Sequence, residues 1–255
     1  MIGWSRSCRT GLYRRKEELA LHTILFDLDG TLLPMDDGAF QEIYNRGLLS
    51  AIPCPDPKGL LRAIWTGVKV MTQNDGARTN SEAFWEHFLR ETGLDCETCE
   101  EGFLRYYTGA FRDCVAACRP SPLSREIVDT LREKGYTVAL ATTPLFPREA
   151  TAVRLGWAGL KEAQFALVST YEDFHFAKPS PNYFREFCAR LGVDTADCLH
   201  IGNDVWEDGA AREAGLSVAL VTDCLINRRE LPLDGYPLYT LEQLAVWARQ
   251  LPPCV

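Results

Sequence analysis

Residues 22–34, HTILFDLDGTLLP, decide the fold of this chain. The stretch begins as an apolar, β-branched run, which is typical of a buried strand, and then presents Asp27 and Asp29, separated by one residue. Residues two apart on an extended strand point to the same side. Two anions on one side repel each other and destabilise the fold unless something compensates. We therefore expect a partner for this pair of carboxylates.

The composition is that of an ordinary globular protein and bounds its function. The chain has 255 residues, 46% hydrophobic and 24% charged, which suits one large domain or one domain with an insertion. A formal net charge of −8 predicts no general attraction to nucleic acid or to an anionic membrane. No apolar run is as long as a membrane span, and the first residues lack the apolar core of a secretory signal. We expect a cytoplasmic protein that handles phosphate, if at all, with a local cation, a metal ion or backbone amides.

Strand and helix patterns alternate from residue 121 onward. Four short runs are apolar on both faces, as in parallel strands buried between helices. Together with the opening run they predict an α/β fold with a Rossmann-like, doubly wound parallel sheet of about five strands. The four runs cover residues 136–141, 164–168, 198–201 and 217–222.

Two of the helices between these runs carry start and stop signals. Each begins with a Ser-Pro pair, at residues 121–122 and 180–181, in which serine caps the helix and proline occupies its first turn. Each ends before a glycine, Gly135 in one and Gly192 in the other.

An interval without convincing strands interrupts the alternation. Residues 36–118 contain helical patterns, for example SEAFWEHFLRETG at 81–93. We predict a discontinuous core of residues 21–35 and 119–255, an all-helical cap of 36–118, and an N-terminal extension of residues 1–20. A cap inserted directly after the acidic pair would lie over the carboxyl edge of the sheet.

Polar side chains gather where the predicted strands end, and ligands of open α/β sheets bind at that edge. Each residue alone has a structural explanation: acids begin turns or helices, and a lysine is usually solvated. Their convergence on one edge favours a functional site. The residues are Asp27, Asp29, Gly30, Thr31, Thr142, Thr143, Lys178, Asp204, Glu207 and Asp208.

Four segments resemble the motifs of the haloacid dehalogenase superfamily of phosphohydrolases: FDLDGTLL, ALATT, AKPSPNYF and IGNDVWED. The resemblance covers residues 21–34 and about 119–222, and the helical insertion matches the family's first cap position. The fourth segment departs from the pattern, because Asn203 stands where many members have an acid right after the glycine. Asp204 and Asp208 are therefore the expected acids on the metal side.

The resemblance implies a Mg²⁺-dependent phosphatase acting on a small phosphorylated metabolite. Asp27 would attack phosphorus and form an aspartyl-phosphate, and Asp29 would be the general acid/base. Magnesium would offset the repulsion between the carboxylates and the phosphoester. Substrate phosphate would be bound by Thr142, Thr143 and Lys178. Thr142 and Lys178 would also be catalytic, because they would bind the equatorial oxygens over which transition-state charge spreads, and Lys178 would offset the crowded acids. Metal would be held by Asp27, Asp29 (through its backbone carbonyl), Asp204 and Asp208.

Three other functions fit the same motifs. A phosphomutase of this fold would return the phosphate to its substrate, and a binding or regulatory module would keep the fold without turnover. A dehalogenase would use Asp27 on carbon, although the family's dehalogenases lack an acid at the position of Asp29. The sequence identifies neither the substrate nor the oligomeric state. Five cap residues either face the site or simply pack and solvate the cap: Asn74, Arg78, Arg105, Tyr106 and Tyr107.

The ten cysteines are scattered, and their default state in such a protein is the reduced thiol. One cluster has spacings that can hold zinc: Cys96, Cys99, Cys114 and Cys118. The stretch is predicted to be one long helix with no turn to bring four sulfurs together. We expect half-buried thiols and no zinc.

Overall fold

The computed structural model of the protein describes residues 21–52 and 54–254. The predicted N-terminal extension of residues 1–20 lies outside this range. The strands are β1 (Thr23–Phe26), β2 (Thr137–Leu140), β3 (Cys198–Gly202), β4 (Ser217–Val221) and β5 (Leu238–Tyr239). The α-helices are α1 (Asp37–Ala51), α2 (Pro57–Thr72), α3 (Asn80–Thr92), α4 (Cys96–Thr108), α5 (Pro122–Glu133), α6 (Arg148–Trp157), α7 (Pro181–Leu191) and α8 (Leu241–Gln250). The 3₁₀ helices are Ala110–Ala117, Glu162–Gln164, Thr195–Asp197 and Gly209–Ala214.

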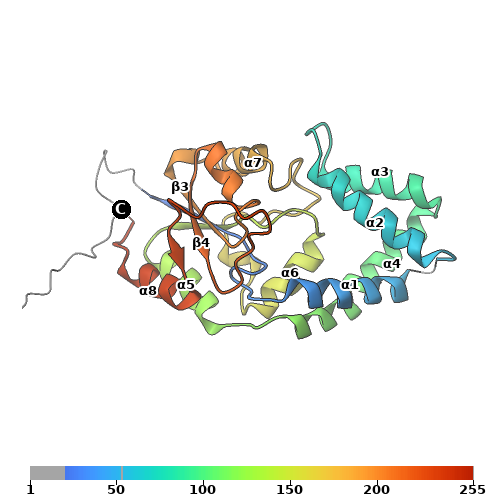
Figure 1. Ribbon diagram of the computed structural model, residues 1–255, viewed down its shortest axis with the longest axis horizontal. Coiled ribbons are helices and arrows are strands. Elements are labelled where there is room, and N and C mark those ends of the chain that lie inside the picture. Colours follow the sequence, from blue (N-terminus) through green and yellow to red (C-terminus); the bar gives the residue numbers. More distant parts are fainter. Residues whose placement is uncertain (1–20, 53, 255) are drawn as a thin grey trace, which may run out of the picture.

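The strands form one parallel sheet in the order β2-β1-β3-β4-β5. Phe26 at the end of β1 lies opposite Leu140 of β2 and Ile201 of β3, so the carboxyl ends of these strands are level. Figure 1 shows the sheet and the helices on it at one end of the molecule, with α2, α3 and α4 at the other.

The sheet carries an apolar core on each face. Ile24 and Phe26 pack on the side of α5 and α8, while Leu25 packs on the side of α7. This alternation follows from the two-residue period of a strand, and it explains why the strand sequences are apolar throughout. The predicted Rossmann-like, doubly wound α/β sheet is confirmed.

One predicted strand is wrong, and one strand was not predicted. Residues 164–168 form no strand: a 3₁₀ turn ends at Gln164, and a single bridge joins Val168 to Leu140 at the edge of β2. The fifth strand is instead β5, two residues long and paired with β4. Its Leu238 is 42% exposed, so the sequence there lacks the apolar pattern of a buried strand.

The predicted helix signals around α5 and α7 are confirmed. Ser121 accepts a hydrogen bond from the Leu123 amide at the start of α5, and Ser180 does the same for Asn182 at the start of α7. Gly192 ends α7 in the left-handed conformation, φ 74°.

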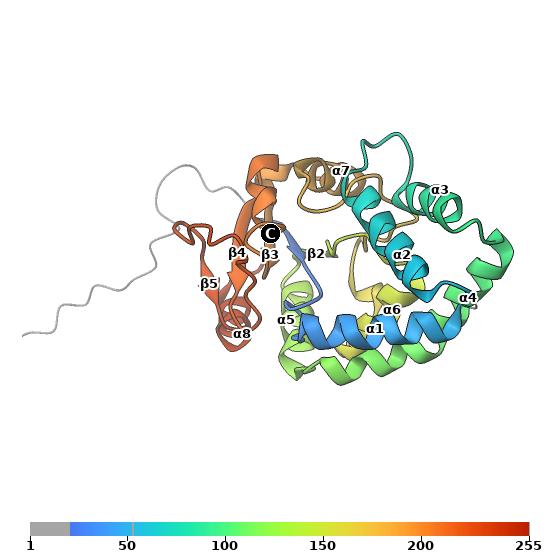
Figure 2. The same ribbon diagram turned by 45° about the vertical axis from the view of Figure 1, so that its right-hand side comes forward.

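Helices α1–α4 pack around their own apolar cluster, which includes Tyr44, Phe88 and Phe111. Helix α6 joins this cluster through Ala150 and lies beside α1 and α4 (Figure 2). Within the described residues of the interval 36–118 the ordered elements are all helical. The exact division into core and cap stays a prediction. None of the described helices is long and apolar enough to cross a membrane.

The predicted single helix through the cysteine cluster is wrong. Helix α4 ends at Thr108, Gly109 has φ −116° and ψ −103°, and a 3₁₀ helix follows. Glycine can take such a conformation, and it breaks the α-helical hydrogen bonding there. Cys99 and Cys114 are buried and Cys96 is exposed, so the thiols have different surroundings. Whether they bind zinc stays a prediction.

Candidate active site

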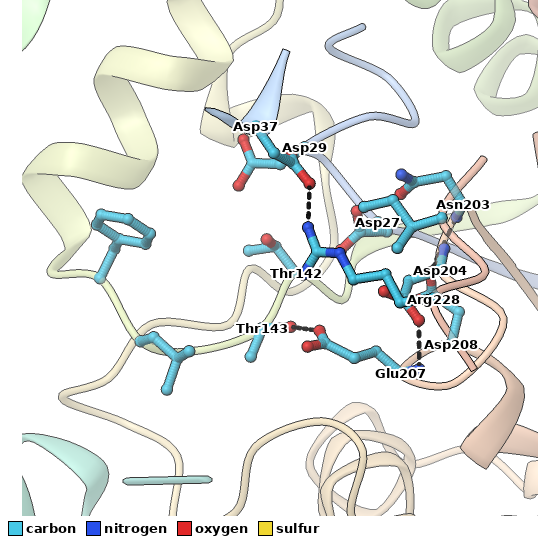
Figure 3. Close-up of a pocket in the computed structure, with 13 residues that line it drawn as sticks. Asp27, Asp29, Asp37, Thr142, Thr143, Asn203, Asp204, Glu207, Asp208 and Arg228 are labelled. Atoms are coloured by element: carbon cyan, nitrogen blue, oxygen red, sulfur yellow. Dashed lines mark hydrogen bonds and ion pairs between the residues drawn. The ribbon is translucent and has the colours of Figure 1, made fainter. Parts of the chain in front are cut away.

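A cavity of about 210 Å³ lies at the carboxyl edge of the sheet. Figure 3 shows the side chains around it, drawn from the ends of β1, β2 and β3 and from the start of α1. The lining residues are Asp27, Asp29, Asp37, Thr142, Thr143, Leu145, Phe146, Asn203, Asp204, Glu207, Asp208, Ile226 and Arg228. Of the residues that the sequence analysis gathers at the strand ends, all but Gly30, Thr31 and Lys178 are in this set. Lys178 hydrogen-bonds to two members of the set, Asp27 and Asp208.

Asp27 is fixed by the strand that precedes it and by the turn that follows. Its backbone amide donates to the Ile201 carbonyl at 2.9 Å, extending the pairing of β1 with β3. Gly30, in the turn, has φ +80°, and a Cβ there would lie 2.2 Å from Nδ2 of Asn203. Asn203 is itself held, because its Oδ1 accepts from the Thr31 hydroxyl at 3.0 Å. Only glycine satisfies both the backbone angle and the close approach.

Lys178 is a buried cation between two carboxylates. Its ammonium is 1% exposed and donates to Oδ1 of Asp27 at 2.7 Å and to Oδ1 of Asp208 at 2.6 Å. Burial alone would lower the pKa of Lys178, but the two carboxylates raise it, so the ammonium stays charged. The lysine predicted from sequence to balance the acids does so directly.

Both carboxylate oxygens of Asp208 accept hydrogen bonds from other residues of the protein. Besides Lys178, its Oδ1 accepts from Nε2 of His200 at 2.8 Å, and its Oδ2 accepts from the amides of Asn203 and Asp204 at 2.9 Å each. Burial alone would raise the pKa of Asp208, but Lys178 and His200 hold it below its usual range. A metal ion would have to compete with these four donors.

Asp204 presents a more open carboxylate. Its Oδ1 accepts from the amides of Trp206 at 2.8 Å and Glu207 at 2.9 Å, and no described residue hydrogen-bonds its Oδ2. Burial raises the pKa of Asp204. Of the two acids expected on the metal side, Asp204 has the free oxygen.

Asp29 is paired with an arginine that sequence reasoning missed. The guanidinium of Arg154, on α6, is 1% exposed, lies over the Phe146 ring and forms an ion pair with Oδ2 of Asp29. Oδ1 of Asp29 is buried with no hydrogen-bond partner among the described residues. One signal in the sequence could have pointed to Arg154: it shares a helix face with the apolar residues Ala150 and Leu155, which are both buried.

The threonines after β2 lie where they were predicted. The Thr142 carbonyl accepts from the hydroxyls of Ser169 at 2.6 Å and Tyr183 at 2.8 Å, which fixes the backbone. The Thr143 hydroxyl donates to Oε2 of Glu207 at 3.2 Å. Burial raises the pKa of Glu207 to about 7, and the Asp204 charge acts in the same direction.

The donor set suits a hard divalent cation. Burial raises the pKa of Asp27 well above its usual range, and the Asp208 and Asp29 carboxylates add to this despite Lys178. A positive charge beside Asp27 would keep it ionised, and the unpaired Oδ1 of Asp29 and free Oδ2 of Asp204 are oxygen donors. The described residues form no ready-made cage of three acidic, histidine or cysteine side chains. Mg²⁺ needs none, because it is usually held by one or two carboxylates with waters and phosphate oxygens.

A second residue that sequence reasoning missed is at the mouth of the pocket. Arg228, in the loop after β4, pairs at 3.2 Å with Asp37 at the start of α1 (Figure 3). A lone arginine in a loop carries no pattern that marks it. By contrast, the five cap residues left open by the sequence do not line the pocket. Tyr106 and Tyr107 are buried and hydrogen-bond to Tyr44 in the apolar cluster of helices α1–α4, called the cap cluster below after the predicted cap.

Solved structures share this fold. The HAD-hydrolase YfnB from Bacillus subtilis, bound to magnesium, aligns with a TM-score of 0.54 over 90% of this chain and 99% of its own, at 20% identity. The L-2-haloacid dehalogenase from Xanthobacter autotrophicus has a TM-score of 0.56 over 91% and 99%, at 16% identity. A structure described as a β-phosphoglucomutase from Thermotoga maritima has 0.55 over 90% and 100%, at 21% identity. These likenesses establish the fold alone.

Sequence comparison finds related phosphatases and a hydrolase family. The phosphoglycolate phosphatase of Mesorhizobium japonicum is 25% identical over 199 residues, 78% of this chain and 81% of that protein. The pyrophosphatase PpaX of Bacillus velezensis is 25% identical over 225 residues, 87% and 92% of the two chains. The profile of the haloacid dehalogenase-like hydrolases matches residues 21–215, most of this chain. The chain belongs to the haloacid dehalogenase-like hydrolase family.

Proposed function

We propose that the protein is a Mg²⁺-dependent phosphatase that hydrolyses a small phosphorylated metabolite through an aspartyl-phosphate on Asp27. The observation that carries the proposal is the buried ion pair between Lys178 and Asp27 at the wall of the pocket. It is supported by the family and by the relatives that are phosphatases. The cavity of about 210 Å³ is below the range of roughly 300–1,000 Å³ typical of larger ligands, which favours a small substrate.

In the first step Asp27 attacks phosphorus. Its Oδ1 is held by Lys178, so we assign the attack to Oδ2. Lys178 and the Thr142 hydroxyl are assigned to the equatorial phosphoryl oxygens, over which charge spreads in the transition state. A bound Mg²⁺ ion would supply charge neutralisation and orientation of the phosphoryl group. Asp204, Asp27 and the Asp29 backbone carbonyl are the residues we assign to hold it; Asp208, whose oxygens are occupied, would act through Lys178.

Asp29 moves the protons. It gives a proton to the leaving oxygen in the first step, and takes one from the water that cleaves the aspartyl-phosphate in the second. Arg154 pairs with one carboxylate oxygen of Asp29, which holds the group at the edge of the pocket.

We propose further that residues 36–118 act as a cap that limits water and selects substrates, since Lys178 and Thr142, assigned above to the phosphoryl group, bind only phosphate. Helix α1 supports this role, because its first residue, Asp37, lines the pocket.

The variants Asp27→Asn and Asp29→Asn test the chemistry with p-nitrophenyl phosphate. Asp29→Asn removes the base for the second step, so we expect a burst of nitrophenol, then turnover about 10²–10⁴-fold slower than wild type, with phosphate trapped on the protein. The first step suffers least here because nitrophenol is a good leaving group. Asp27→Asn should give neither burst nor turnover. A slow Asp29→Asn enzyme with no burst would mean that Asp29 positions other groups rather than moving protons.

Two measurements distinguish the proposed phosphatase from the other functions: the dependence of turnover on metal and the acceptor to which the phosphate is transferred. We expect no wild-type turnover in excess chelator and recovery with added Mg²⁺; full activity in chelator would contradict the metal assignment. Return of labelled phosphate to substrate rather than to water would identify a phosphomutase. No turnover of any phosphoester would favour a binding or regulatory module.

A further inference from the structure

We infer that the substrate carries a second anionic group besides the phosphate that is cleaved, and that Arg228 binds it. The inference rests on the proposed phosphatase function and names the substrate class for the same pocket. The second group is a carboxylate or another phosphate, since a guanidinium pairs with both through two parallel hydrogen bonds.

The charge of the pocket is the first argument. Its acidic lining residues are Asp27, Asp29, Asp37, Asp204, Glu207 and Asp208. Arg228 is the one cation among the described residues that line it. Lys178 does not line the pocket; it pairs with Asp27 and Asp208, and its remaining hydrogen-bonding capacity is assigned to the phosphate that is cleaved. Arg228 is therefore the only charged residue of the described lining that attracts a second anion on a substrate, because every other charged lining residue is a carboxylate.

The placement of Arg228 is the second argument. Its loop is tied to the site two residues earlier: the Ile226 amide donates to the Asn203 carbonyl at 2.8 Å, and the Val205 amide donates to the Ile226 carbonyl at 2.9 Å. These two hydrogen bonds hold the loop that carries Arg228 beside the segment after β3 that carries Asp204. Figure 3 shows the Arg228 side chain extending into the space between the lining residues.

The present partner of Arg228 can be exchanged. Its ion pair with Asp37 is exposed on both sides, 77% for Arg228 and 44% for Asp37. Exposed pairs of this kind contribute little to folding stability. A substrate anion can replace Asp37 at little cost, whereas the buried guanidinium of Arg154 has no such freedom.

Matched pairs of esters test the inference. One pair is 2-phosphoglycolate and its neutral amide, 2-phosphoglycolamide; the other is ethanediol bisphosphate and 2-hydroxyethyl phosphate. For Arg228→Ala we expect kcat/KM to fall about tenfold or more on the charged member of at least one pair, mainly through KM, and less than about twofold on the neutral member. Arg228→Lys should lose less than Arg228→Ala. The pair that responds tells a carboxylate from a phosphate.

Two further variants sharpen the test. Arg229→Ala is the matched control, because Arg229 stacks on the Trp206 ring at 3.6 Å and does not line the pocket. It should leave both members of each pair unchanged. Asp37→Asn removes the competing partner and a repelling charge, so it should lower KM for the charged member about two- to fivefold.

Each other outcome overturns the inference. Equal losses on charged and neutral esters would mean that Arg228 contributes only general charge or joins the cap to the core. No loss on any ester would mean that Arg228 binds no part of the substrate. Suppose that the wild-type protein releases phosphate from p-nitrophenyl phosphate but that Arg228→Ala does not change the ratio of kcat/KM between the charged and the neutral member of either pair. The inference then fails while the proposed function stands. No release from any ester overturns both.

Discussion

At the residue scale, the buried pair between Arg154 and Asp29 has a consequence for proton transfer. Arg154→Met removes the group that holds Asp29 but keeps a long apolar side chain over Phe146. We expect kcat to fall about 10- to 100-fold for alkyl phosphates, whose leaving oxygen needs a proton, and to fall much less for release of nitrophenol. These losses are smaller than those expected from removing the acid itself. Stability should also fall, because removing one partner of a largely buried ion pair leaves the Asp29 carboxylate without its counter-charge.

The control for this variant is on the same helix. Arg148 pairs with Glu162 and Asp173 at the surface, and Arg148→Met should leave the dependence on the leaving group unchanged. Steady-state and burst kinetics over a series of esters give the measurement. If Arg154→Met slows good and poor leaving groups alike, Arg154 does not act through the proton carried by Asp29.

The two acids after β3 should respond differently to the same isosteric change. Asp204→Asn should raise the Mg²⁺ concentration for half-maximal activity and reduce the rise in melting temperature that Mg²⁺ produces, since it alters the freer carboxylate. Asp208→Asn should lower stability without Mg²⁺ by about 3–5 kcal/mol, because it leaves the buried Lys178 with one carboxylate. Thermal melting with and without Mg²⁺ separates the two effects. The reverse pattern would mean that the fourth motif is misaligned.

Among the residues of the site, those at strand ends could be predicted and those that reach in from elsewhere could not. Asp27 follows β1 directly and Thr142 comes two residues after β2, so the sheet largely fixes where they lie. Arg154 comes from the middle of a helix, where a single charge in a short amphipathic pattern is normally solvated. Arg228 depends on how a long loop folds over the sheet edge, and no local pattern encodes that path.

At the scale of elements, the turn after β1 depends on Gly30. Alanine there would take a left-handed φ of +80° and place Cβ against Asn203. We expect Gly30→Ala to destabilise the protein by about 1–3 kcal/mol and to reduce activity strongly, because Asn203 or the turn must shift beside Asp27.

Gly93 offers a matched control for that variant. It ends α3 with φ +63°, and a Cβ there would meet nothing within 4 Å. Gly93→Ala should therefore cost only the backbone strain, about 1 kcal/mol, and keep full activity. Urea unfolding gives both free energies. Equal losses of stability, with activity retained in both, would show that the contact with Asn203 is unimportant.

The sequence predicted the central elements better than the edges, for a physical reason. Strands β1 and β3 are covered on both sides by helices, so their apolar runs have one explanation. Residues 164–168 are also apolar because Phe165 and Val168 belong to a core cluster of the sheet. They hydrogen-bond to the edge strand β2 through their backbone but form a single bridge, to Leu140, and so no regular strand. Strand β5 pairs with β4 through backbone hydrogen bonds. Because Leu238 is exposed, the sequence of β5 lacks the apolar pattern that would predict a buried strand.

At the scale of the whole molecule, the helical region and the sheet meet near the pocket. Phe146 lines the pocket, and Phe40 of α1 packs edge-on against it with 6.5 Å between ring centres. Phe40 also contacts Tyr44 and Phe111 in the cap cluster. Movement of the cap is therefore expected to move one wall of the pocket.

This contact gives a test of the cap. Phe40→Ala removes the aromatic link while the assigned groups around Asp27 stay in place. If the cap selects substrates, the variant should keep its rate on a small ester such as acetyl phosphate within about threefold. Its rates on larger esters should change by about tenfold or more, because we assign the phosphate to Lys178 and Thr142, which leaves the wall at Phe146 for the leaving group. Trp65→Ala is the control, since it also removes a cap aromatic near Tyr44 but one away from the pocket. A uniform loss over small and large esters in Phe40→Ala, scaling with lost stability, would argue that the cap is structural and that selection lies in the core.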